Sequence, residues 1–315
     1  MIIIQMKPSF GFSKILKCKY IFKLIIMKIL FVNTRIHHKN QHAINNYKII
    51  QFTTIHSVEE INNYNLDDFD CVYSPSYPIN VSLYPNTKFI FGPHFSVFPD
   101  NRLLQIKDKR ENVVFNQLSE WVVNMWKLYD ICKDMRLECI PFGVDTLKFH
   151  EKKSIQERNK VLVYIKHRDP IELIEILNML STRNIDYRLF DYSRRYDEQD
   201  YLNYLQECKY AIFIIAHESQ GFAVQEALAC NVPLFVWTVK SMNQELNQNY
   251  PDFYATSIPY WDNRCGEFFY YSEQIDSMFD SFLKRLDTYE PRKYILENLS
   301  MDVCEKRWME IIKNM

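Results

Sequence analysis

Short, continuous apolar runs alternate with helical segments through the second half of the chain, and few folds accommodate that order. The segment Tyr210 to Ile215 is apolar throughout, as is typical of a strand buried on both faces of a parallel sheet. Further strands are predicted at 160–165, 186–190 and 234–237, with helices at 170–180, 198–208 and 222–230. The alternation predicts a right-handed, doubly wound α/β domain whose ligands bind at the carboxyl ends of its strands.

The first helix of this half has a clear start signal. Asp169 and Pro170 supply an N-cap and a first-turn proline. The apolar residues that follow are Ile171, Ile174, Leu177 and Leu180. We expect these four residues to share one face of the helix.

The first half of the chain repeats the strand, loop and helix pattern. Its apolar runs lie at 28–33, 48–52, 70–73, 88–91 and 113–116, with a helix at 119–128. The charged stretch 151–160 contains almost no apolar residue and indicates a domain boundary. We divide the chain into a leader at 1–26, a first domain at 27–141, a hinge at 142–159, a second domain at 160–300 and a carboxyl-terminal helix at 301–315.

Glycine content and charge exclude several functions. The chain has 5 glycines, and their spacing matches neither the Gly-x-Gly-x-x-Gly dinucleotide fingerprint nor the Walker A loop. Its 38 basic and 39 acidic residues give a net charge of -1. A chain without a positive field has no general attraction for nucleic acid, so we expect no nucleic-acid partner.

Cysteine usage and the acidic motifs favour a metal-free intracellular protein. The 8 cysteines never form Cys-x-x-Cys, which indicates free thiols in a reducing, cytoplasmic compartment. No His and Cys residues have zinc-finger spacing. Asp68 and Asp70 form an Asp-x-Asp that could hold a divalent cation, although acidic residues before a strand more often belong to an ordinary loop.

The leader differs in composition from the rest of the chain. It carries Lys7, Lys14, Lys17, Lys19 and Lys23 and no acidic residue. Its most apolar part is shorter than the roughly 20 residues that a spanning helix needs. The leader is therefore interpreted as lying outside the fold, with Met27 as an alternative start and peripheral contact with anionic membrane left open.

The segment that follows the central strand of the second half can bind a phosphate. Gly221 directly precedes the predicted helix start, where free backbone N–H groups and the helix dipole favour an anion. Glu218 lies before that start and Glu226 lies one turn beyond Phe222 on the same face. Two carboxylates that flank a phosphate suit a ligand with hydroxyls on both sides of a diphosphate, which is the chemistry of a sugar nucleotide.

A basic triplet follows the first strand of the same half. Lys166, His167 and Arg168 lie at its carboxyl end, where they could supply cations for a diphosphate. The alternative is a solvated basic turn. Similarly, Glu226 could be an ordinary surface glutamate, and His94, in Gly92-Pro93-His94, an ordinary loop histidine.

These residues resemble a known family. The segment 218–229, which begins Glu-Ser-Gln-Gly-Phe and is closed by Pro233, is similar to the Glu-x7-Glu signature of the group 1 glycosyl transferases, retaining enzymes of the GT-B fold. Residues 140–149 resemble the interdomain segment of the same enzymes. The resemblance implies a GT-B architecture, in which two Rossmann-like, doubly wound domains face each other across a cleft, with the acceptor bound in the first domain and the donor in the second.

The resemblance also implies roles for individual residues. Glu218 would contact the donor sugar, Glu226 the ribose, and Lys166 and Arg168 the diphosphate. His94 would face the donor sugar, with His37 and His38 as alternatives. The remaining donor-binding candidates are Ser219, Gln220, Gly221, Phe222 and, as a stacking partner for the base, Tyr192.

The sequence thus indicates a glycosyltransferase that moves a sugar from a nucleotide-diphosphate-sugar to a glycan or other hydroxyl acceptor, with retention. No metal is implied, because the helix start and the cations can stabilise the departing diphosphate. No cofactor is implied, because the nucleotide sugar is itself the donor substrate. The alternatives are a sugar-nucleotide epimerase of the same fold, a non-catalytic nucleotide- or glycan-binding module, and a metal-dependent transferase using Asp68 and Asp70.

Overall fold

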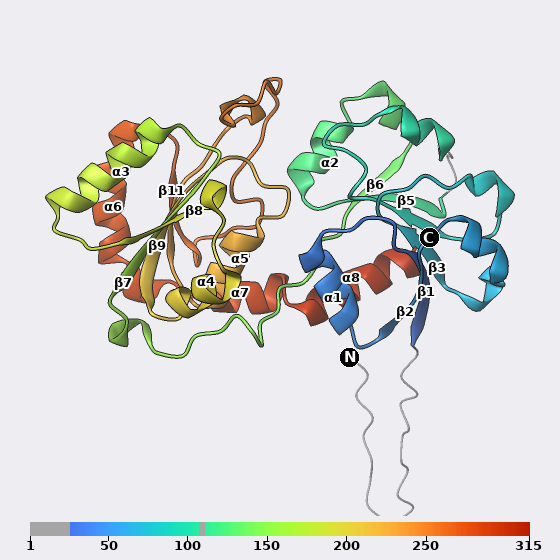
Figure 1. Ribbon diagram of the computed structural model, residues 1–315, viewed down its shortest axis with the longest axis horizontal. Helices are drawn as coiled ribbons and strands as arrows, with labels where there is room; N and C mark the ends of the chain where they lie inside the picture. Colours follow the sequence, from blue (N-terminus) through green and yellow to red (C-terminus); the bar gives the residue numbers. More distant parts are fainter. Residues whose placement is uncertain (1–25, 107–110) are drawn as a thin grey trace, which may run out of the picture.

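The computed structural model describes residues 26–106 and 111–315 and contains two parallel β-sheets that lie side by side (Figure 1). The predicted leader, 1–26, lies outside the described residues except for Ile26. Helices pack against each sheet, so the chain has the predicted α/β class with two doubly wound halves. In the part of the chain that the structure describes, no helix is long and apolar enough to cross a membrane.

The first sheet has the strand order β2-β1-β3-β4-β5-β6. Its strands are β1 (Met27–Val32), β2 (Ile50–Ile55), β3 (Cys71–Ser74), β4 (Phe89–Phe91), β5 (Val113–Gln117) and β6 (Arg136–Cys139), and its helices are α1 (His38–Asn46) and α2 (Glu120–Trp126). The five strands and the helix predicted for this half are confirmed. α1 and β6 are additional elements, and both lack the apolar runs on which the prediction relied.

The second sheet has the order β11-β10-β9-β7-β8. Its strands are β7 (Lys160–Lys166), β8 (Arg188–Asp191), β9 (Cys208–Ile215), β10 (Leu234–Trp237) and β11 (Gly266–Phe269), and its helices are α3 (Pro170–Thr182), α4 (Glu198–Leu205), α5 (Phe222–Ala229), α6 (Ile275–Lys284) and α7 (Pro291–Asn298). β9 lies at the centre and is almost entirely buried, as its apolar sequence predicts.

The start of α3 is confirmed, but its predicted apolar face is only partly correct. The side chain of Asp169 accepts a hydrogen bond from the backbone N–H of Ile171 at 2.9 Å. However, Ile171 and Ile174 are 62% and 54% exposed. Positions three residues apart rotate gradually around a helix of 3.6 residues per turn. The predicted Leu180 is therefore buried and Leu177 is partly buried, and Ile176 and Met179 complete the buried face.

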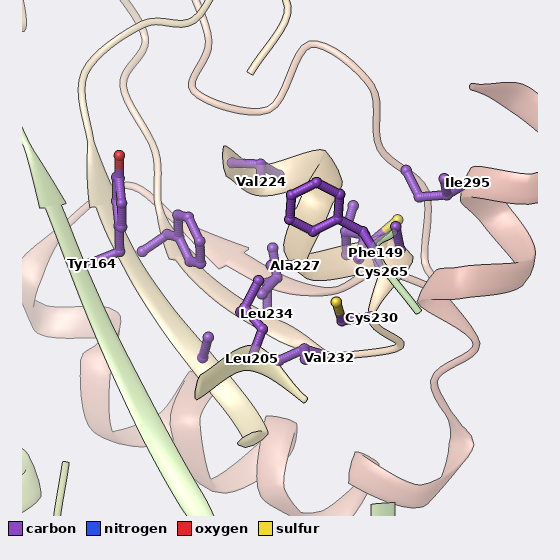
Figure 2. Packing of buried hydrophobic residues seen from close by; sticks show 14 of the residues in the cluster. Phe149, Tyr164, Leu205, Val224, Ala227, Cys230, Val232, Leu234, Cys265 and Ile295 are labelled. Atoms are coloured by element: carbon purple, nitrogen blue, oxygen red, sulfur yellow. The ribbon is translucent and has the colours of Figure 1, made fainter. Parts of the chain in front are cut away.

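The second half has a buried cluster on each face of its sheet, and one of these holds α5. Figure 2 shows Val224 and Ala227 of α5 gathered with Phe149 of the hinge and Ile295 of α7 in one buried cluster. Aliphatic and aromatic side chains of this size stabilise a fold by about 1.5 to 3 kcal/mol each on full burial. This packing fixes α5, and hence its amino terminus, against the sheet.

The chain crosses between the two halves twice, and the crossings touch. The first is the hinge that follows β6, and the second joins α7 to α8 (Met301–Lys313), which returns to the first sheet (Figure 1). The backbone N–H of Val144 donates to the carbonyl of Leu299 at 2.9 Å. A Cβ on Gly143 would lie 2.3 Å from the Cα of Met301, so only glycine permits this approach.

α8 is part of the core of the first half. Trp308 is fully buried, and its ring centroid lies 4.9 Å from that of Tyr73 on β3 and 5.6 Å from that of Phe142. The last helix therefore completes the first domain although it follows the second in sequence. The boundaries drawn above between the segments stay a prediction.

Candidate active site

A cavity of about 1240 Å³ lies between the two domains. Its walls are formed by the loops that follow β1, β4, β7, β8 and β9, and by the first turns of α1, α2 and α5. These loops leave the carboxyl ends of parallel strands, which is where open α/β sheets bind their ligands. Of the predicted site residues, those that line the cavity are His94, Lys166, Tyr192, Glu218, Ser219, Gln220, Gly221, Phe222 and Glu226.

α5 begins at the cavity wall with its amino terminus open to the cavity. Its N-cap, Gly221, has a φ of 79°, a left-handed conformation that glycine adopts without a steric penalty. The first backbone N–H groups of a helix have no acceptor within the helix. Together with the positive end of the helix dipole, they form a site suited to a phosphate or another anion.

Lys166 and Glu218 form an ion pair beside this helix start. The Nζ of Lys166 lies 2.7 Å from Oε1 of Glu218 and 4.7 Å from the ring centroid of Tyr192. Burial alone would lower the pKa of Lys166, but the Glu218 carboxylate outweighs it and the pKa is raised. The cavity therefore offers a firmly charged ammonium group for an anion and a carboxylate that can accept hydrogen bonds from hydroxyls.

Glu226 is not a surface residue. It is 4% exposed, and its carboxylate pairs with the ammonium of Lys39 from the first domain. Burial raises the pKa of Glu226 to about 7, against the opposing effect of Lys39. Lys39 also lies 3.4 Å from Glu198, so this lysine bridges two carboxylates of the opposite domain.

Lys39 is not among the site residues predicted from the sequence, although its position after a predicted strand could have indicated it. It lies just beyond the carboxyl end of β1, in the same loop and helix start as His37 and His38, which were considered. Only the packing of the two domains brings it to Glu226, a residue 187 positions away.

The three candidate histidines meet at the cavity. The Nε2 of His94 accepts from the backbone N–H of His37 at 3.4 Å, so Nδ1 carries the proton in the neutral ring. Asn40 Nδ2 lies 2.9 Å from the same Nε2. The His37 ring stacks on Phe222 with a centroid distance of 5.9 Å, and His38 Nε2 lies 3.2 Å from Glu198 Oε1.

Two of these histidines are neutral at physiological pH. Burial, followed by the charges of His37 and Arg35, lowers the pKa of His94 to about 4. Burial and the neighbouring His38 and Lys39 lower the pKa of His37 to about 4 as well. His94 can therefore donate one hydrogen bond from Nδ1 without carrying a charge.

Gln220 and Trp121 tie the loop before α5 to the rest of the protein. The Gln220 amide accepts from the Phe142 backbone N–H at 3.1 Å and donates to its carbonyl at 2.6 Å. Trp121 Nε1 donates to the carbonyl of Glu218 at 2.9 Å. The side chain of Gln220 is thus engaged with the hinge. Its backbone groups remain the part of this residue for which donor binding is still predicted.

Arg168 does not line the cavity, contrary to the arrangement expected from the basic triplet. Its guanidinium is buried and donates to the carbonyls of Ile215 at 3.1 Å and Trp237 at 3.0 Å. Its Nε donates to Glu172 at 2.7 Å. Glu172, four residues later, pairs with the guanidinium. Arg168 therefore lies under the ends of β9 and β10, where it links the two strands and does not reach the cavity.

Glu226 gives the folded protein a distinctive pH dependence. Because the pKa of Glu226 is raised to about 7 in the folded state, its contribution to stability is fully present below the unfolded-state pKa and is lost as the pH rises through about 7. We expect the melting temperature of the wild type to fall relative to that of Glu226→Gln between about pH 5 and pH 8. Thermal melts of both proteins measure this, and parallel pH profiles would contradict it.

Comparisons with known proteins support the fold but identify no close relative. Neither a scan against protein-family models nor a search of curated proteins finds a match. Among solved structures, one of trehalose-6-phosphate synthase, from a study of glycosyltransfer with retention that used bisubstrate glycomimetics, is 10% identical, with a TM-score of 0.56 over 91% of this chain and 99% of that one. A chain of the GtfA/B complex is 13% identical, with a TM-score of 0.43 over 72% of this chain and 52% of that one. The first likeness shows that the two domains have the GT-B arrangement.

Proposed function

We propose that the protein is a glycosyltransferase that moves a sugar from a nucleotide-diphosphate-sugar to a hydroxyl acceptor, with retention and without a metal ion. In this reaction the bond between the anomeric carbon and the diphosphate oxygen breaks, and a bond to the acceptor oxygen forms as that hydroxyl loses its proton. The negative charge that develops on the departing diphosphate must be stabilised by the protein.

One observation carries the proposal. An anion-binding helix start, the Lys166 ammonium and two carboxylates converge in a single cavity between the domains. Lys166 and the N–H groups of α5 would stabilise the diphosphate, while Glu218 would accept from sugar hydroxyls and Glu226 from those of the ribose. The GT-B arrangement of the domains and the function named for the trehalose-6-phosphate synthase neighbour are consistent with this reading.

The other candidate residues complete the proposed donor site. Neutral His94 would donate from Nδ1 to the donor sugar, and Tyr192, which is 45% exposed, would stack on the base. Asp68 and Asp70 do not line the cavity, and Asp70 accepts a hydrogen bond from the backbone N–H of Lys28 at 2.7 Å. We therefore assign them no part in the reaction.

A binding screen tests the donor site. We expect one of the UDP-, GDP- or ADP-sugars to bind the wild type with and without chelator, and to bind Glu226→Gln about tenfold more weakly, because an amide accepts fewer hydrogen bonds from ribose hydroxyls. Calorimetry measures both affinities. Glu273→Gln, which changes an exposed glutamate outside the cavity, is the matched control and should bind as the wild type does.

The outcomes separate the alternatives. Absence of binding by every donor would contradict the proposal and favour a non-catalytic role. Loss of binding with chelator would favour a metal-dependent enzyme. Conversion of the bound donor into its sugar epimer without any acceptor, detected by nuclear magnetic resonance, would identify an epimerase of this fold.

A further inference from the structure

The two walls of the cavity differ in their carboxylates, although both carry cations, which on the second-domain wall include Lys166 and Arg195. Its carboxylates all come from the second domain, and these are Glu198, Glu218, Glu226 and Glu245. Among the described lining residues, the first domain contributes no carboxylate. It contributes the cations Arg35 and Lys39 together with His37, His38 and His94.

Arg35 is the cation of this wall that remains available to a ligand. Lys39 is engaged with Glu226 and Glu198. His37 and His94 are neutral near pH 7, because burial lowers the pKa of each to about 4. Arg35 is exposed and forms no ion pair with any residue in 26–106 or 111–315, so its guanidinium can accept an anionic partner.

The loop that carries Arg35 is held by hydrogen bonds of neighbouring residues. Asn33 Nδ2 donates to Gln41 Oε1 at 3.0 Å, and the hydroxyls of Thr34 and Ser76 lie 2.8 Å apart. The charge of Arg35 also acts on the His94 ring. The arginine therefore lies on a supported loop beside the residue that we propose faces the donor sugar.

Two buried amides on the same wall each have one atom without a hydrogen-bond partner among the described residues. Asn40 is 1% exposed and Gln117 is 4% exposed, and both line the cavity. The Oδ1 of Asn40 and the Nε2 of Gln117 have no partner among the described residues. An unpaired buried acceptor or donor costs about 1 to 3 kcal/mol, and a hydroxyl, which both donates and accepts, would satisfy either atom.

We infer that the acceptor is a hydroxyl-bearing compound with an anionic group, a phosphate or a carboxylate, which binds Arg35 while Asn40 and Gln117 contact its hydroxyls. The inference rests on the proposed function, since it places an acceptor opposite the donor site. It assigns the anionic group of the acceptor to the first-domain wall, which contributes no carboxylate among the described lining residues.

Three ligands that differ only at one carbon test this inference. Glucose, glucose 6-phosphate and glucuronate share a sugar ring and present a hydroxymethyl, a phosphate or a carboxylate at the same position. We expect one of the two anions to bind the full chain at least about tenfold more tightly than glucose, with an affinity that falls as salt rises. Titrations followed by nuclear magnetic resonance measure the affinities.

Substitutions test whether Arg35 is the residue that causes the preference for an anionic ligand. Arg35→Gln should reduce the affinity for the preferred anion about tenfold and leave the affinity for glucose unchanged, whereas Arg35→Lys should restore part of the loss. Arg195→Gln, which removes a cation from the opposite wall of the same cavity, is the matched control and should keep the preference.

The inference would be overturned if glucose bound as tightly as both anions, if no anion bound, or if Arg35→Gln kept the preference. Nucleotide binding to the same proteins separates this failure from that of the proposed function. A wild type that binds a nucleotide but shows no anion preference refutes the acceptor class alone, whereas one that binds no nucleotide refutes the proposed function.

Discussion

Replacing Glu218 with glutamine is expected to reduce the turnover number for sugar transfer at least about 100-fold, the size of effect seen when an electrostatic contact made in the transition state is removed. The carboxylate lies 2.7 Å from Lys166 at the start of α5. The amide is nearly isosteric but cannot form the ion pair, so the orientation of Lys166 is lost and the proposed contact with the donor sugar is weakened. Steady-state kinetics with the donor found by the binding screen measure the effect.

Glu245→Gln is the matched control for this substitution. Glu245 also lines the cavity, where it pairs with His167 at 2.9 Å and with His217 at 3.3 Å, and we assign it no contact with the reacting groups. Its replacement should lower turnover far less. Full activity in Glu218→Gln would contradict the proposed site. An equal loss of turnover in both variants would show that the effect is not specific to Glu218.

Replacing Arg168 with methionine is expected to destabilise the protein by about 3 to 5 kcal/mol, as removal of one partner of a buried ion pair does. The change removes a charged donor from the carbonyls of Ile215 and Trp237 and leaves Glu172 without its cation. For a domain of this size, the melting temperature should fall by roughly 10 °C. Thermal unfolding followed by circular dichroism measures it.

Arg183→Met provides the comparison for Arg168. Arg183 is paired with Asp276 and Asp280 at the surface, and pairs of that kind contribute about 0.2 to 1 kcal/mol. Its loss should barely shift the melting temperature. If Arg168→Met instead melted normally and lost only nucleotide affinity, the arginine would have the diphosphate-binding role that the sequence first indicated.

The sequence predicts elements whose signal is local. β9 and the start of α3 follow from a continuous apolar run and from Asp169 with Pro170. β6 consists of Arg136, Leu137, Glu138 and Cys139, and so resembles a loop until it pairs with β5. α1 is equally polar, with only Asn40, Ala43 and Ile44 buried, and therefore presents no apolar stripe.

The same distinction explains the site. The Glu-x7-Glu spacing lies within one loop and one helix, so local geometry was enough to place Glu218 and Glu226 at one cavity. The fate of Arg168 depends on carbonyls at the ends of two other strands, and the role of Lys39 depends on the opposite domain. Neither contact can be predicted from the residues that are adjacent to Arg168 or Lys39 in the sequence.

The double crossing of the chain determines how the cavity can open. Two polypeptide strands, joined by the Val144 to Leu299 hydrogen bond and by the close approach of Gly143 to Met301, resist both stretching and twisting where they meet. We expect the easiest relative motion of the two domains to be rotation about an axis through these crossings. Groups far from that axis then separate widely, while the crossings themselves barely move. We expect a rotation of this kind to widen the cavity and then to return its two walls to the same alignment.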